Sequence, residues 1–290
     1  MYPYLGVSLA LLALLGWGFG DFLIQKTTRL VGSWRALFWI ALLGAVVIFP
    51  FVIKDIPYLK VSDLVLLGVL SVVVVLGSLF NFEALRRGKM VIVEPIISLE
   101  LPITIGLSVF FLRERLELIP WILIALVFIG IILAITKHHT HWFYHRRVLE
   151  KGVILACIGA VGTALSSFLI GVSSQNISPL ITVWFVDIII VLVCGFYLLY
   201  SKQFKELGKD LKKYKWSIIG QSFFDNLGWV AFATATTLIP ISIAITISES
   251  YVALAVLLGF FINREKLQKY QLVGAALAII SVIVLAGIYQ

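Results

Sequence analysis

The charged motifs Arg113-Glu114-Arg115-Leu116 and Arg264-Glu265-Lys266-Leu267 are near copies of each other and lie 151 residues apart. Each follows a pair of phenylalanines and precedes the last long apolar stretch of its half of the chain. Each half holds five such stretches. Because five is odd, the second half enters a membrane from the side opposite to the first. The pattern predicts two inverted repeats of five helices, as in many secondary transporters.

The composition is that of an integral membrane protein. Of the 290 residues, 61% are hydrophobic and 13% are charged, and the mean hydropathy is +1.07. These values lie far from the balance of a soluble domain. A spanning helix needs about 20 apolar residues, so ten of them leave only short connections. Unpaired backbone amides are costly in hydrocarbon, and we therefore expect an all-α protein.

We expect the ten transmembrane helices at the following positions. They run over residues 4–24, 36–53, 63–82, 91–112, 119–136, 152–173, 180–200, 214–235, 241–262 and 271–288. The first repeat then covers residues 1–137 with helices one to five, and the second covers residues 151–290 with helices six to ten. Residues 138–150 form the connector between them.

Lysine and arginine gather in the connections on one side of the membrane. Four of the 23 lie on the other side, at Lys54, Lys60, Arg113 and Arg115. Since basic residues favour the cytoplasmic side, the connector is predicted to be cytoplasmic and both termini extracytoplasmic, in a multi-pass protein of the cytoplasmic (inner) membrane. Topology thus explains the net charge of +8, and we expect no nucleic-acid partner.

The repeated motifs resemble the EamA repeat of the drug/metabolite transporter superfamily. In the first copy the similar residues are Phe82-Glu83-Ala84-Leu85, Glu94-Pro95, Pro102, Phe110-Phe111, Arg113 to Leu116 and Gly130; in the second they are Ala235, Pro240, Ser248-Glu249, Gly259, Arg264 to Leu267 and Gly274. The resemblance implies ten helices around a central cavity that opens alternately to either side. It also implies a small metabolite as substrate. Several members have cytoplasmic termini, whereas the charge count of this chain favours the reverse.

Five acidic residues inside the predicted spans are the best candidates for a binding or coupling site. They are Asp21, Glu100, Asp187, Asp225 and Glu249. A charged group costs about 2.5–3.5 kcal/mol at the centre of a spanning helix, so it usually faces a cavity or a partner. Few basic residues lie deep enough to neutralise these five. An acidic cavity attracts protons and cationic or zwitterionic groups. The alternative is that the carboxyls are structural and hydrogen-bonded to neighbouring helices.

Other residues join these five with different predicted roles. Glu100 lies between Pro95 and Pro102, where missing amide donors can open a helix. Asn226 extends a polar stripe beside Asp225, and Trp17 is a candidate for cation–π contact, with helix packing as the alternative. Glu114 and its repeat copy Glu265 lie at span ends among basic residues, which favours a structural role in pairing with a neighbouring helix end.

These features predict a secondary active transporter of an amino acid, an amine or a drug-like solute, working by alternating access with protons as a candidate coupling ion. Its partners are the solute and the lipid bilayer, and a second copy of the chain is a further candidate. No ATP-binding loop is visible, so we expect no cofactor. The histidines at 138, 139, 141 and 145 lack the spacing of a compact metal site, and no metal is predicted.

Two alternatives remain open. One is a non-transporting accessory or receptor protein with the same fold. The other is a flippase or enzyme acting on lipid-linked substrates. An enzyme needs a nucleophile, a base or a metal cluster near an interface, and the sequence shows no such constellation. We therefore expect the protein not to be an enzyme.

The charge count makes a direct prediction of sidedness. A reporter enzyme that is active only outside the cytoplasm should be active when fused after Gln290 and inactive when inserted in the connector at residues 138–150. The measurement is reporter activity in intact cells. Activity in the connector with silence at Gln290 would reverse the predicted orientation.

Overall fold

The computed structural model describes residues 3–87, 93, 96–135, 151–254 and 268–289. Within these residues the regular structure is entirely helical. The helices are α1 (Pro3–Val31), α2 (Ser33–Val52), the short 3-10 turn η1 (Ile56–Tyr58), α3 (Val61–Arg87), α5 (Glu100–Phe111), α6 (Leu118–Ile135), α7 (Lys151–Asn176), α8 (Pro179–Tyr200), α9 (Glu206–Ala235), α10 (Ile241–Glu249) and α12 (Lys269–Ile288).

Among the described residues, seven helices are long and apolar enough to cross a membrane: α1, α2, α3, α6, α7, α8 and α12. Residues Glu100–Phe111 and Ile241–Leu254 form shorter apolar helices. The outer faces carry exposed aliphatic side chains, as on α3 at Val65, Val69 and Val72, which suits contact with lipid. The prediction of an all-α membrane protein is confirmed, and the full number of ten spans stays a prediction.

Two of the predicted spans, 91–112 and 241–262, each contain a turn within their described part. The first is interrupted by a turn at Ser98 and Leu99, after which α5 begins at Glu100. The second is interrupted at Ser250, directly after α10 ends. Leu99 and Ser250 are 151 residues apart, the spacing of the charged motifs. At the second break Ser250 Oγ donates to the carbonyl of Ile247 at 2.6 Å, a local hydrogen bond that competes with helix continuation.

Several helices extend past the predicted apolar limits. Helix α1 continues to Val31, and α2 follows after Gly32 alone, whose φ of 92° suits a residue without a side chain. Helix α9 starts eight residues before the predicted span, and Tyr214 (φ −123°, ψ 25°) marks where its polar beginning meets the apolar part. The length of an apolar stretch reflects the thickness of the hydrocarbon layer that it crosses. The end of a helix is instead set by its backbone hydrogen bonds, so a helix can continue beyond the apolar stretch.

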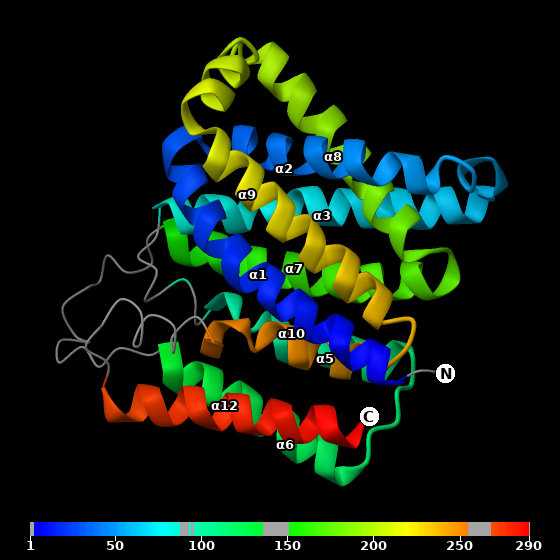
Figure 1. Cartoon of the computed structure of the whole chain (residues 1–290), viewed down its shortest axis with the longest axis vertical. Coiled ribbons are helices and arrows are strands. Elements are labelled where there is room, and N and C mark those ends of the chain that lie inside the picture. Colours follow the sequence, from blue (N-terminus) through cyan, green and yellow to red (C-terminus); the bar gives the residue numbers. More distant parts are fainter. Residues whose placement is uncertain (1–2, 88–92, 94–95, 136–150, 255–267, 290) are drawn as a thin grey trace.

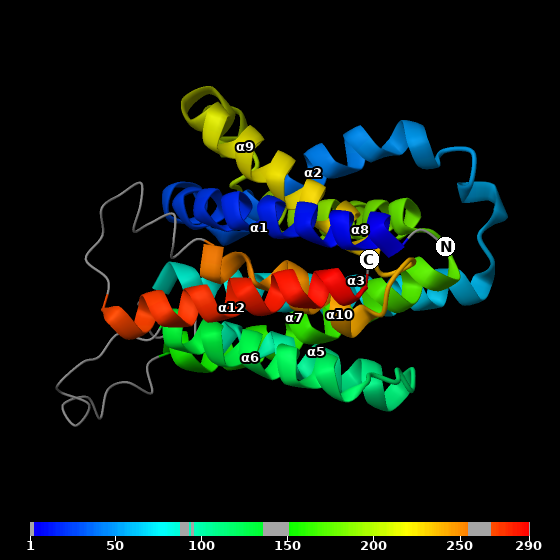
Figure 2. The same cartoon turned by 60° about the horizontal axis from the view of Figure 1, so that its bottom comes forward.

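The two halves of the chain are interleaved rather than placed side by side. Helix α1 packs along α9, α3 along α7, α2 along α8 and α6 along α12, so each of these pairs joins one half to the other. Figure 1 shows α1 and α9 lying together in front of the row formed by α2, α3 and α7. The start of α1 and the end of α12 lie at the same end of the bundle (Figures 1 and 2).

Glycine pairs let these helices approach until their backbones touch. A methyl group added at Gly77 would lie 2.9 Å from the carbonyl carbon of Gly162, and one at Gly16 would lie 2.8 Å from the amide nitrogen of Gly228. The pairs are Gly16–Gly228 between α1 and α9, Gly77–Gly162 between α3 and α7, and Gly130–Gly274 between α6 and α12. Small residues of this kind permit close packing of helices in membranes.

The pair on α3 and α7 gives a stability test with a matched control. We expect Gly77→Ala to destabilise the protein by about 1–3 kcal/mol, because the added methyl group overlaps a neighbouring backbone that cannot move away easily. Gly68→Ala in the same helix meets no atom within 4 Å and should leave stability unchanged or raise it. Thermal unfolding in detergent measures both variants. Equal midpoints for the two would contradict the packing role.

Candidate functional site

Five carboxyl groups that lie far apart in the sequence meet at one central cavity. Its non-atom space is about 1050 Å³, including the part open to solvent. The carboxyls belong to Asp21 of α1, Glu100 of α5, Asp187 of α8, Asp225 of α9 and Glu249 of α10. Neither lysine nor arginine occurs among the described residues that line this cavity. The structure thus brings together all five acids that the sequence singled out, in a space of acidic character.

The carboxyls of Asp21, Glu100, Asp187, Asp225 and Glu249 share the lining of one cavity. Like charges repel strongly where water is scarce. A proton or a positively charged group entering the cavity reduces this repulsion.

Glu100 is held by a hydroxyl group of α7. Its side chain is nearly buried, and Ser167 Oγ donates to Glu100 Oε1 at 2.6 Å. Thr163 lines the same cavity, but its hydroxyl donates to the carbonyls of Gly159 at 3.0 Å and Ala160 at 3.2 Å in its own helix.

Glu100 is also the first residue of α5. The amides of Leu101 and Ile103 in the first turn of α5 are paired with the carbonyls of Ser98 and Leu99, so they are not available to this carboxyl. The hydrogen bond from Ser167 therefore orients the carboxyl of Glu100, and it does so without a basic side chain.

Glu249 occupies the opposite kind of position. It is the last residue of α10 and is also nearly buried. A helix C-terminus presents carbonyl oxygens and a partial negative charge. The carboxyl of Glu249 therefore adds to a negative end of the helix at the cavity wall.

Asp187 and Asn226 fill a space opened by Gly44 of α2. A side chain at residue 44 would overlap Asp187 Oδ2 and Asn226 Oδ1. Asn226 Nδ2 donates to the carbonyls of Ile40 at 3.1 Å and Ser222 at 2.9 Å, so Asn226 supports the wall and is not among the lining residues. Within the described part of the chain, Asp187 Oδ2 is buried without a hydrogen-bond partner.

Aromatic residues form the wall around the remaining two acids. The Tyr251 hydroxyl is hydrogen-bonded to Asp21, and the Trp229 indole to Asp225. Trp17 lines the cavity and packs edge-on against Trp229, with ring centroids 4.9 Å apart. Trp17 Nε1 is buried and has no hydrogen-bond partner among the described residues. Trp17 therefore serves helix packing and cavity lining together.

Sequence reasoning missed four polar residues of the cavity: Ser78, Asn81, Thr163 and Tyr251. Asn81 has a buried Oδ1 atom without a partner in the described part of the chain. These side chains carry no charge, and polar neutral residues are common between packed helices. For Asn81 the sequence did hold a signal, since an amide side chain near the end of an apolar span is a candidate for lining a cavity.

The first charged motif connects the two halves. Glu114 accepts hydrogen bonds from the amides of Ile241 at 2.7 Å and Ser242 at 3.1 Å, and from Ser242 Oγ at 2.5 Å. Glu114 thus caps the N-terminus of α10. Arg113, the residue before Glu114, has a left-handed backbone conformation with φ 54°. Pro102 lies in the first turn of α5, where a missing amide does little harm. Pro95, Glu265 and the four histidines lie outside the described residues.

Comparison with known proteins identifies the family. The EamA-like transporter family matches the chain twice, over residues 4–136 and 150–287. The chain belongs to the EamA-like transporter family. The resemblance seen in the sequence is thereby confirmed, and this EamA-type protein is a multi-pass membrane protein of the drug/metabolite transporter type. The family is described as one of transporters.

Two further similarities accompany the family match. An uncharacterised protein of Methanocaldococcus jannaschii is 49% identical over 63 residues, which are 22% of this chain and 46% of that protein. The chain thus aligns with about half the length of this curated relative. A solved crystal structure shares 13% sequence identity with a TM-score of 0.72, covering 96% of this chain and 95% of its own. At that identity the likeness shows a shared fold alone.

The cap on α10 yields a second stability test. Glu114→Gln keeps one acceptor oxygen but loses the charge that holds the two amides, and we expect a loss of about 0.5–2 kcal/mol. Glu117 is exposed in the same connection, so Glu117→Gln is the matched control and should have no effect. Thermal unfolding of the purified variants measures the difference. Identical unfolding of the two variants would show that the cap does not stabilise the fold.

Proposed function

We propose that this EamA-family protein is a ten-span secondary carrier that binds a small cationic or zwitterionic solute in the central cavity. The observation that supports the proposal best is the convergence of five carboxyls in a cavity without a lysine or arginine among its described lining residues. An amino acid, an amine or a drug-like solute with a positive group suits this chemistry. The solute crosses the cytoplasmic membrane by alternating access.

The cavity offers two kinds of contact to such a solute. Carboxylates attract its positive group. Trp17 and Trp229 offer aromatic surface to an apolar part, or a ring face to the cation itself. Most substrate pockets combine an apolar wall with a few polar groups that fix orientation.

Alternating access is supported by the way the two repeats pack. The contact of α1 with α9 has its counterpart in that of α7 with α3, and the contact of α1 with α10 has its counterpart in that of α7 with α5. The helix breaks recur with the repeat spacing at Leu99 and Ser250. Interrupted helices at the interface of inverted repeats are typical binding sites of secondary transporters. In this scheme the repeats at 1–137 and 151–290 exchange conformations as the cavity opens to one side and then to the other. Residues 138–150 form the cytoplasmic connector, and both termini lie outside.

Proton coupling follows from competition for the same carboxyls. A carboxyl that has taken up a proton no longer attracts a cation, so the cavity holds either the proton or the positive solute. Two ligands that exclude each other at one site are linked reciprocally. A carrier of this design exchanges protons for solute across the membrane.

Transport by the purified protein in liposomes tests the proposal. A panel of labelled amino acids, amines, nucleosides and aromatic drugs is followed with and without a pH gradient, and we expect movement of at least one cationic or zwitterionic member that the gradient accelerates. Glu249→Gln and Glu100→Gln should each lower the rate about tenfold or more, since a buried charge contact is lost.

The control is Glu206→Gln, because Glu206 is a partly exposed residue paired with Lys209 and does not line the cavity. It should transport at the unmodified rate. Correct insertion of all variants is checked by their thermal unfolding in detergent. Unchanged transport in both cavity variants would remove the two glutamates from the mechanism, and absence of any solute movement would overturn the carrier proposal itself.

A further inference from the structure

A second pocket lies at one end of the bundle, where α1 is followed by α2. Its non-atom space is about 700 Å³, including the part open to solvent. Thr28 and Ser33 line it, one helical turn beyond Ile24 and Leu37 of the central cavity. The two pockets therefore follow one another along the bundle. We call the second one the arginine pocket, after Arg29 of α1, Arg35 of α2 and Arg86 of α3.

The charge of the arginine pocket is positive. Arg35 pairs with Asp210 at 2.8 Å, and Arg86 pairs with Glu83 at 3.2 Å. Glu83 is shared with Arg87. Arg29 makes no ion pair within the described part of the chain, and the described residues lining the pocket include neither aspartate nor glutamate. Three arginines thus line the pocket, and the carboxylates paired with two of them lie outside the described lining.

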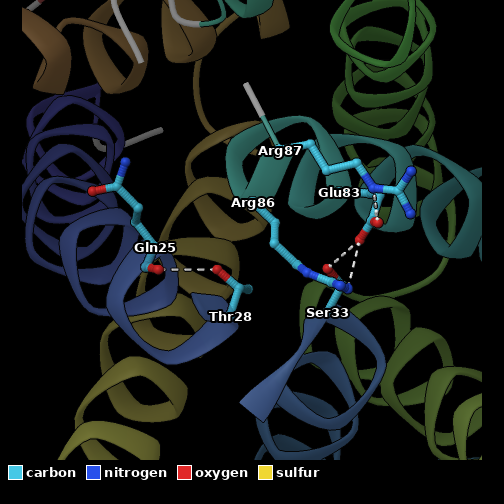
Figure 3. A network of polar contacts seen from close by, with 6 residues as sticks. All are labelled: Gln25, Thr28, Ser33, Glu83, Arg86 and Arg87. Atoms are coloured by element: carbon cyan, nitrogen blue, oxygen red, sulfur yellow. Dashed lines mark hydrogen bonds and ion pairs between the residues drawn. The ribbon is translucent and has the colours of Figure 1, made fainter. Parts of the chain in front are cut away.

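Hydrogen-bond donors in the pocket point to an acceptor that is not part of the chain. Helix α2 begins here without a side-chain cap, so its first amides are available to a ligand. Arg35 Nε is buried and has no hydrogen-bond partner among the described residues. Figure 3 shows the guanidinium of Arg86 beside Ser33, while Arg87 lies on the other side of Glu83. The donors come from three helices and surround one space.

We propose that the arginine pocket binds a phosphate group, held by Arg29 and Arg86 and by the first amides of α2. The planar fork of arginine matches phosphate oxygens, and a helix N-terminus favours an anion. The pocket lies where the apolar span of α1 ends and that of α2 begins, and the ends of spanning helices meet the headgroup region of a bilayer. A soluble phosphate ester presents the same group, so the chemistry is shared by two sources.

Binding here has a structural consequence for the neighbouring helices. Glu83 of α3 accepts a hydrogen bond from Ser33 Oγ of α2 at 3.0 Å and is held by Arg86 and Arg87. A phosphate in the pocket competes with Glu83 for Arg86. Occupancy thus changes the link between α2 and α3 one turn from the central cavity.

Ligand-induced thermal stabilisation of the full chain in a neutral detergent tests the proposal. The probes are short-chain phosphatidylglycerol, short-chain phosphatidylcholine and inorganic phosphate. We expect phosphatidylglycerol to raise the unfolding temperature at lower concentration than phosphatidylcholine. Arg29→Gln should raise the concentration for half effect about tenfold, since a charge-assisted contact is lost. It leaves no carboxylate without its partner, so folding should be retained.

Arg87→Gln is the matched control, because Arg87 shares Glu83 with Arg86 but does not line the pocket. It should respond like the unmodified protein. Stabilisation by phosphatidylglycerol alone, weakened in Arg29→Gln, assigns the pocket to lipid phosphate; stabilisation also by inorganic phosphate assigns it to phosphate from either source. Equal responses of both variants, or no response to any probe, would overturn the proposal. Because binding and not transport is measured, the result is independent of the carrier proposal.

Discussion

The close backbone contact between helices of opposite halves is the constraint on which the site depends. Gly16 meets Gly228 at the crossing of α1 and α9. Along α1, Asp21 lies a little over one helical turn after Gly16, and along α9, Asp225 lies just under one turn before Gly228. The crossing therefore brings the two acids to the same level of the cavity. Larger residues at the two glycines would separate the helices, and the acids would no longer share one space. Close packing and the acidic cavity are therefore parts of one arrangement.

The acids of the cavity are satisfied only in part by the protein itself. Hydroxyl groups of Ser167 and Tyr251 and the indole of Trp229 supply hydrogen bonds, but such donors do not cancel a charge. Asp187 Oδ2 lacks even such a donor among the described residues. Removing a carboxylate from water without a partner is costly. A proton or a positive group from outside lowers that cost, which gives a physical reason for a site that accepts either.

The sequence was sufficient for the membrane class and the family, and it singled out five acids that the fold brings to one cavity. Charges inside apolar spans and a motif repeated at 151 residues are rare by chance. The sequence was insufficient for the helix ends and for the breaks at Leu99 and Ser250. Those depend on local hydrogen bonds, such as that of Ser250 to Ile247, which hydropathy does not register. Neutral lining residues such as Asn81 were not predicted for a related reason, since only the fold shows which polar side chains face a cavity.

The two glutamates at the breaks show how repeats with one fold acquire different electrostatics. In register, Ser250 matches Leu99, so Glu249 stands before its break and Glu100 stands after the corresponding one. Glu100 begins α5, and the hydroxyl of Ser167 donates a hydrogen bond to it. Glu249 ends α10, where the carbonyls of the helix oppose a negative charge. A shift of two residues between otherwise matched helices is enough to make the two sides of the cavity unequal, and a carrier whose two sides are unequal can hold its ligand differently in its two orientations.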